Sequence, residues 1–244
     1  MTFYDGYLMS KIDPIELLYF KREKEKAKHF LKQRKHSQRI TQWVATEIVS
    51  TVNHKQRVVV LGKFISLCME LLRLQNFEGF LNIFLGLKKN TVQKLTETWE
   101  DLGEKQYLAF QNLEAKLSNG YTQFLDFVSS CPAPKIPPIN IIIKYINLQD
   151  EEPTLCKGTY LINFMKFRGM SHLMMNLYQT DWEGFEIEPQ PAIQLYLKSH
   201  LHIIPDKELM LTTQKLSTKD GKDKKTFLFP KKEVLQKAED LLFK

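Results

Sequence analysis

Apolar residues recur at helical spacing through most of the chain. The first clear stripe, at positions i, i+3, i+4 and i+8, is formed by Ile40, Trp43, Val44 and Ile48. Residues 58–72, 77–87 and 108–117 carry similar stripes, with a break at Asn76 and a stop near Gly120. Residues three and four apart lie on one face of a helix, so each stripe predicts an amphipathic helix with one buried face. The pattern therefore predicts a protein built mainly of helices.

Prolines divide the chain after residue 130. The run CPAPKIPP, residues 131–138, cannot lie inside a helix, because proline lacks an amide donor and clashes with the preceding turn. The isoleucine-rich residues 139–148 favour a buried strand by propensity. Residues 159–178 predict a long helix whose apolar faces include Leu161, and Pro189 and Pro191 open another helix.

The end of the chain differs from the rest. Beyond Ser217 it becomes polar and basic, and no internal repeat is present. We interpret residues 218–244 as a loosely attached basic tail with a short amphipathic helix from Glu233. Residues 1–217 then form the globular part.

The composition is that of a folded protein with an uneven charge distribution. Apolar residues make up 43% of the 244 residues, and the formal net charge is +7. Much of this charge lies in one run, against Glu23 and Glu25. The run consists of Lys21, Arg22, Lys24, Lys26, Lys28, Lys32, Arg34, Lys35 and Arg39. Such a run is most often a solvated helix face, but anionic lipid or nucleic acid can also bind it.

Catalytic and cofactor motifs are absent from the sequence. There is no GxxxxGK[ST] or GxGxxG phosphate loop, no GxSxG and no HExxH. Cys68, Cys131 and Cys156 are widely spaced, which predicts free thiols in a reducing compartment rather than a disulfide framework or a zinc site. No apolar run approaches the ~20 residues of a membrane span, and the first residues lack the features of a signal peptide. We expect a cytoplasmic protein with no metal and no cofactor.

Several blocks carry a resemblance to a known family. They are WVATEI (43–48), RLQNF (73–77), FLNIFLGLKKNTVQKL (80–95), TW (98–99), CPAPKIPPINIIIKYINLQDEE (131–152) and INFMKFR (162–168). In their order and spacing they resemble the catalytic domain of the Ras guanine-nucleotide exchange factors, the RasGEF domain.

The resemblance covers residues 1–217 and implies a fold. The expected fold is an all-α, multi-helix bowl from which a helical hairpin protrudes, here over about residues 138–178. It also implies that residues 139–148 are the first helix of that hairpin, against their strand propensity.

The resemblance implies a function that forms no covalent bond. Such a domain grips a Ras-family small GTPase and wedges its hairpin beside switch I, near the phosphate and Mg²⁺ site. It favours the nucleotide-free GTPase, so GDP leaves and GTP replaces it. Glu151 matches the hairpin glutamate of the family, and Asn147 lies one turn earlier; these two are the candidate residues for nucleotide displacement.

The same resemblance implies further functional residues. The candidate contacts with the GTPase are Leu81, Lys88, Gln93, Tyr121, Pro138 and Arg168. The candidate structural residues are Trp43, Asn76 and Phe77. For Leu81, Phe77 and Tyr121, ordinary core packing is the interpretation that the sequence alone favours.

Some positions depart from the family pattern, and they keep other functions open. Ser37 and Gln38 stand where the family commonly has Phe-Asn, and Lys88, Gln93, Pro138 and Gly169 also differ. The alternatives are an exchange-inactive scaffold or adaptor of the same fold, and a basic helical module that binds nucleic acid or lipid. Nucleic acid is the less expected partner. Recruitment to an anionic membrane through Lys21–Arg39 is compatible with exchange activity, and the sequence names no particular GTPase.

Overall fold

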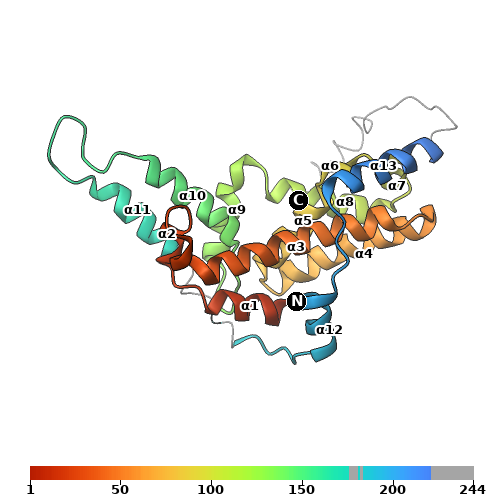
Figure 1. Cartoon of the computed structure of the whole chain (residues 1–244), viewed down its shortest axis with the longest axis horizontal. Helices are drawn as coiled ribbons and strands as arrows, with labels where there is room; N and C mark the ends of the chain where they lie inside the picture. Colours follow the sequence, from red (N-terminus) through yellow and green to blue (C-terminus); the bar gives the residue numbers. More distant parts are fainter. Residues whose placement is uncertain (176–180, 182–183, 221–244) are drawn as a thin grey trace, which may run out of the picture.

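The computed structural model describes residues 1–175, 181 and 184–220, and this part of the chain is helical, as predicted (Figure 1). The α-helices are α1 (Thr2–Ser10), α2 (Glu16–Tyr19), α3 (Lys28–Ser50), α4 (His54–Arg73), α5 (Phe77–Leu87), α6 (Asn90–Gln93), α7 (Thr96–Glu100), α8 (Glu104–Lys116), α9 (Thr122–Ser130), α10 (Ile139–Glu151), α11 (Phe164–Met175), α12 (Pro191–Leu195) and α13 (Asp206–Asp220). Shorter turns are η1 (Lys24–Ala27), η2 (Asn119–Tyr121) and the π-helical η4 (Tyr196–His200).

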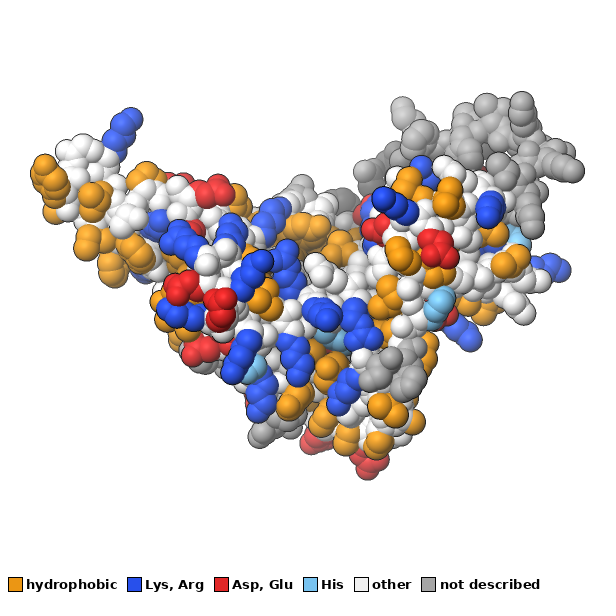
Figure 2. Space-filling model, in the orientation of Figure 1, with side chains coloured by type: hydrophobic (Ala, Val, Ile, Leu, Met, Phe, Trp, Pro, Cys, Tyr) orange, Lys and Arg blue, Asp and Glu red, His pale blue; other side chains and the backbone are white. Residues whose placement is uncertain are grey.

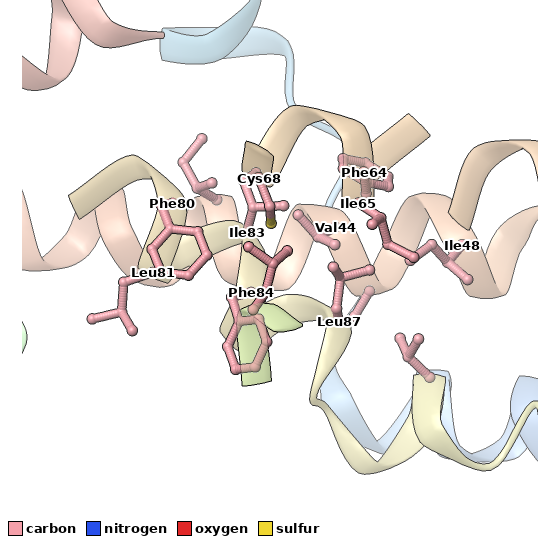
Figure 3. Close-up of a cluster of buried hydrophobic side chains, with 14 of the residues drawn as sticks. Val44, Ile48, Phe64, Ile65, Cys68, Phe80, Leu81, Ile83, Phe84 and Leu87 are labelled. Carbon is pink, nitrogen blue, oxygen red and sulfur yellow. The ribbon is translucent and has the colours of Figure 1, made fainter. Parts of the chain in front are cut away.

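The main core lies where α5 packs against both α3 and α4. Helix α5 has almost no exposed face, because every residue from Phe77 to Leu87 except Leu85 is buried. Figure 3 shows its side chains interleaved with those of the two long helices. The labelled members of this cluster are Val44, Ile48, Phe64, Ile65, Cys68, Phe80, Leu81, Ile83, Phe84 and Leu87. The stripes predicted at 40–48, 58–72 and 77–87 are therefore confirmed as α3, α4 and α5.

Helices α3 and α5 approach closely at Gly86. A β-carbon on Gly86 would lie 2.6 Å from the Val44 β-carbon and 2.8 Å from the Thr41 carbonyl oxygen. Nearby, the Thr41 hydroxyl donates to the carbonyl oxygen of Asn82 at 3.1 Å. Only a residue without a side chain fits where the two backbones come so near.

Asn76 begins α5 and joins it to α1. Its side-chain oxygen accepts from the Gly79 amide at 2.7 Å, which satisfies one of the free donors at the helix start. Its amide nitrogen donates to Asp5 at 2.8 Å and to Thr2 at 3.1 Å. All three side chains are buried, so Asn76 fixes the N-terminal helix against the core.

The isoleucine-rich segment is the helix α10, as the family resemblance implied and against its strand propensity. Ile139, Ile142, Ile143 and Ile146 are buried, and they fall at i, i+3, i+4 and i+7. They pack in a second core cluster with Phe20, which directly follows α2, and with Phe30 of α3. The helical spacing of the buried positions decides the conformation, because it brings all four side chains to one face.

The helix predicted over residues 159–178 begins later, at Phe164, and this prediction is wrong at its start. Residues 152–163 form the connection between α10 and α11, where Leu155 and Ile162 make an isolated antiparallel bridge. Leu161, expected on an apolar helix face, is 68% exposed in this connection. Residues 176–178 lie outside the described part.

The C-terminal helix α13 is held to the body by a charged contact. Asp206 accepts hydrogen bonds from the Lys89 ammonium at 2.7 Å and from the Gln42 amide at 2.9 Å. The hydrogen bond from Lys89 has the largest effect in lowering the pKa of the Asp206 carboxyl, and the hydrogen bond from Gln42 lowers it further. Helix α13 continues to Asp220, past the expected domain end at residue 217, and the helix expected from Glu233 lies outside the described residues. No described helix is both long and apolar enough to cross a bilayer.

We expect Gly86→Ala to destabilise the protein by about 1–3 kcal/mol, because the new methyl group meets backbone and a buried Val44. The matched control is Gly62→Ala in α4, whose β-carbon would lie 3.1 Å from the Gln106 side chain and, at ordinary van der Waals distance, 3.7 Å from the Leu102 side chain. Gln106 is exposed and can move, so this change is expected to be neutral or stabilising by up to about 1 kcal/mol. Urea unfolding measures both free energies, and equal effects would contradict the close approach of α3 and α5.

Candidate functional site

Helices α10 and α11 form an arm that extends away from the body (Figure 1). The connection of residues 152–163 lies at its far end, and Figure 2 shows the surface hollowed between this arm and the end of the molecule that carries α13. Asn147 and Glu151 lie four residues apart near the outer end of α10, which puts them on one face. Asn147 is half-buried and Glu151 is exposed.

Three acidic residues, Asp150, Glu151 and Glu152, lie at the C-terminal end of α10, and only the Asp150 side chain is engaged within the described part of the chain. The Asp150 carboxylate lies 3.4 Å from the Arg22 guanidinium and 3.7 Å from the Lys166 ammonium. The Glu151 carboxylate makes no hydrogen bond or ion pair with any residue that the structure describes. Glu151 is therefore available for a partner, whereas Asp150 is engaged within the chain.

Two residues of the INFMKFR block hold the end of the arm together. The Lys166 ammonium donates to the carbonyl oxygens of Asp150, at 2.8 Å, and Glu152, at 2.7 Å. The Asn163 amide group donates to the carbonyl oxygen of Pro153 at 3.1 Å. Sequence reasoning missed both residues, although they stand inside a block that carried the resemblance.

The base of the arm is fastened to the η2 turn. Pro138 is buried at the N-terminus of α10. The Tyr145 hydroxyl donates to the Gly120 carbonyl oxygen at 2.6 Å, and the Lys144 ammonium lies 5.5 Å from the centre of the Tyr121 ring. Tyr121, half-buried, is thus close to the arm.

Arg168 is the remaining predicted contact residue on the arm. It is exposed on α11 and lines a shallow hollow together with Gln149, Glu152 and His172. Asn147, Glu151 and Arg168 thus all lie on the arm, but neither Asn147 nor Glu151 lines the hollow that Arg168 faces.

The other predicted contact residues belong to the helical body. Lys88 is exposed at the end of α5 and pairs with Glu114. Gln93 is half-buried and donates to the Leu87 carbonyl oxygen at 2.9 Å. Leu81 is 2% exposed, so almost none of its side chain is open to a partner.

The three residues predicted to be structural lie in or against the main core. Phe77 is buried next to Phe124, with ring centroids 5.9 Å apart, and Asn76 caps α5. The Trp43 indole packs on Phe64, with ring centroids 5.2 Å apart, and donates to Glu47 at 2.8 Å.

A buried carboxyl group lies beneath the base of the arm. One oxygen of Glu78 accepts from Ser37 at 2.6 Å, from Asn140 at 2.9 Å and from Asn82 at 3.3 Å. The other oxygen is buried with no partner among the described residues. Burial disfavours the charged form and raises the pKa of Glu78 above its ordinary value, and the nearby Asp5 carboxyl adds to this shift. This polar cluster connects α3, α5 and α10.

Exposed cations gather on the face of the molecule shown in Figure 2. Eight of the nine basic residues from Lys21 to Arg39 are exposed; the ninth, Arg39, is half-buried and donates to the Lys198 carbonyl oxygen at 2.6 Å. Lys21, Lys24 and Lys35 line one shallow hollow beside Phe20. Among the described residues, no group of three or more acidic, histidine or cysteine side chains is arranged to hold a metal ion.

Comparisons with known proteins agree with this architecture. The model of the RasGEF domain matches residues 1–168. The chain is 29% identical over 215 residues to Ras guanine nucleotide exchange factor Q of Dictyostelium discoideum, covering 86% of the chain and 16% of that protein. It is 24% identical over 204 residues to Protein son of sevenless of Drosophila melanogaster, covering 81% and 13%. The chain spans about a sixth of the length of the curated relatives it matches.

We expect Glu78→Gln to change how stability depends on pH. The pKa of Glu78 is higher in the folded protein than in the unfolded chain, where it is near 4.5. Protonated Glu78 therefore contributes to the free energy of unfolding below this unfolded-state pKa, and the contribution is lost as the pH rises through the folded-state pKa. The amide has no such loss. Between these two pKa values, the free energy of unfolding of the variant should therefore rise relative to that of the wild type by up to ~1.4 kcal/mol per pH unit.

Urea unfolding between about pH 4.5 and pH 8 measures this difference. The exposed Glu100→Gln is the matched control and should show a constant offset from the wild type. A constant offset for Glu78→Gln as well would contradict the raised pKa of this carboxyl group.

Proposed function

The chain belongs to the RasGEF domain family, and on that premise we propose that it is a guanine-nucleotide exchange factor for a Ras-family small GTPase. One observation carries the proposal: the arm presents Glu151, an unpaired carboxylate, at the exposed end of α10. Its relatives named as exchange factors, such as the one from Dictyostelium discoideum, support the same activity.

The proposed mechanism is displacement of the nucleotide. A GTPase holds its nucleotide through phosphate contacts and Mg²⁺. A carboxylate brought to this site repels the phosphates and competes with them for the ion. Glu151 supplies that charge, and Asn147 approaches from the same face of α10. No covalent bond forms, and the chain prefers the nucleotide-free GTPase, which GTP then fills by mass action.

The proposed contact surface extends from the arm to the body. Arg168 and Tyr121 contribute from the arm and its base, and Lys88 and Gln93 contribute from the ends of α5 and α6. Pro138 acts at the base, where it is buried and fixes the start of α10.

A scaffold of the same fold is the second candidate function. It is favoured by the substitutions relative to the family pattern at Ser37, Lys88, Gln93, Pro138 and Gly169. Lys88 is engaged by Glu114, so one of these positions already has a partner within the chain. A scaffold binds a GTPase without accelerating nucleotide release.

We also propose that the face around Lys21–Arg39 attracts an anionic membrane. Eight of its nine cations are exposed, and each contributes about 1 kcal/mol near an anionic surface. A membrane held at this face would concentrate the protein near lipid-anchored GTPases.

Glu151→Ala is expected to slow GDP release from the cognate GTPase by roughly tenfold or more, because the competing carboxylate is lost. The test is release of a fluorescent GDP analogue from Ras, Rap, Ral and R-Ras proteins, with and without the chain. The control is Glu152→Ala, the exposed neighbour whose carbonyl rather than carboxylate binds Lys166.

Equal rates for Glu151→Ala and the wild type would remove the proposed mechanism. If the folded wild type accelerates no GTPase in the panel, the scaffold function is the better account. A GTPase that is bound but not exchanged would identify the partner of that scaffold.

The triple substitution Lys21→Glu, Lys24→Glu and Lys35→Glu is expected to weaken binding to vesicles containing phosphatidylserine by at least about a hundredfold. The control is Lys55→Glu, Lys63→Glu and Lys105→Glu, which makes the same charge change at exposed lysines elsewhere. Co-sedimentation at low and physiological salt measures both. Equal losses would show that net charge, and not this face, drives the binding.

A further inference from the structure

We propose that Lys166 is a positioning residue that fixes the backbone of Glu151. This inference rests on the proposed function for its catalytic meaning, but its structural part is independent of it. The motivating observation is that a buried cation binds the two carbonyl groups on either side of Glu151.

The two hydrogen bonds of the Lys166 ammonium group flank a single residue. Its ammonium donates to the carbonyl oxygen of Asp150 at 2.8 Å and to that of Glu152 at 2.7 Å. The residue between them is Glu151. Lys166 is only 6% exposed, although it lies on an arm whose other side chains are mostly in contact with solvent.

The chemistry of a helix end explains why a lysine lies there. Helix α10 ends at Glu151, and its last carbonyl groups have no amide partner within the helix. They also carry the negative end of the helix dipole, which favours a cation. The Asp150 carboxylate, 3.7 Å away, adds an opposite charge. The buried ammonium is therefore both hydrogen-bonded and paired, as a buried charge requires.

Asn163 completes the arrangement from the other side. Its backbone amide donates to the Thr154 carbonyl oxygen at 2.8 Å, and its side-chain amide donates to that of Pro153 at 3.1 Å. Its side-chain oxygen accepts from the Lys166 backbone amide at 3.3 Å. Asn163 and Lys166 thus attach the backbone of the residues next to Glu151 to the start of α11. These residues are Asp150, Glu152, Pro153 and Thr154.

The result is a fixed backbone with a free side chain. The carboxylate of Glu151 has no partner among the described residues, while the peptide groups on both sides of it are bound. A group held in place before its partner arrives does not have to be ordered during binding, and a misplacement of about 1 Å can cost a hundredfold in rate.

The same device occurs elsewhere in the chain without a glutamate beside it. The buried Lys135 donates to the carbonyl oxygens of Val128, Ser129 and Cys131 at the end of α9, at 2.7–3.2 Å. A buried lysine thus caps the C-terminal end of two helices, α9 and α10. What distinguishes Lys166 is the free carboxylate between its two carbonyl partners.

The experiment is a double-mutant cycle in the full chain with Lys166→Met and Glu151→Ala, using the cognate GTPase. Lys166→Met keeps the apolar stem and removes the cation. We expect it to slow GDP release roughly tenfold in the wild-type background and to have no further effect when Glu151 is alanine. The control is Lys157→Met, which removes an exposed lysine from the same connection and should change neither rate.

A loss of equal size in both backgrounds, or no loss in either, would overturn the positioning role. Asn163→Ala, which removes the second half of the arrangement, replaces Lys166→Met if that variant does not fold. The same cycle applies to it.

Amide hydrogen exchange of residues 150–156 separates this inference from the proposed function. Lys166→Met should speed exchange there while Lys157→Met leaves it unchanged, whether or not the chain accelerates any GTPase. Unchanged protection in Lys166→Met would overturn the inference even if the wild type proves to be an active exchange factor.

Discussion

The burial of α5 on all sides is the constraint on which the rest of the structure depends. A helix with no solvent face needs a neighbour on each side, and the long helices α3 and α4 provide two of them. Its first turn cannot be capped by water, so Asn76 caps it and draws Asp5 and α1 against the core. The segment that leads into the arm is attached at the same point, because Phe77 donates its amide to Ile136 and Ile136 donates to Gln75.

The arm is stabilised in two different ways along its length. At its base, the isoleucines of α10 pack with Phe20 and Phe30 in a second apolar cluster. At its outer end few apolar side chains are buried, and hydrogen bonds from Lys166 and Asn163 take over. Apolar packing tolerates small shifts, whereas a cation bound to two carbonyl groups has a defined geometry. The more directional interaction is therefore found at the end that carries Glu151.

Much of the fold follows from the sequence, because the buried faces of α3, α4 and α5 repeat at helical spacing. Residues 139–148 were harder, because isoleucine favours strands and only the family resemblance indicated α10; the helical spacing of the buried positions became visible in the structure. The start of α11 was misplaced because Leu161 is apolar yet exposed, so its hydrophobicity carried no information about a core. The role of Lys166 was not predictable, since its carbonyl partners lie 14 and 16 residues away and are peptide groups with no sequence signal. That Asp150 is the acid of its run engaged within the chain, whereas the carboxylates of Glu151 and Glu152 have no partner among the described residues, likewise required the contacts of Asp150.

The polar cluster around Glu78 has a consequence for how this domain can be recombined with its relatives. Ser37, Asn82 and Asn140 all direct hydrogen bonds to one carboxyl oxygen, and they come from three different helices. Replacing any one of them with an apolar residue removes one of the three hydrogen bonds that compensate the burial of this carboxyl group. Grafting the arm of a relative onto this body, or exchanging α3 alone, would separate Asn140 or Ser37 from Glu78. A working chimera must transfer these positions as a set, so the boundary between interchangeable parts does not coincide with the visible boundary between body and arm.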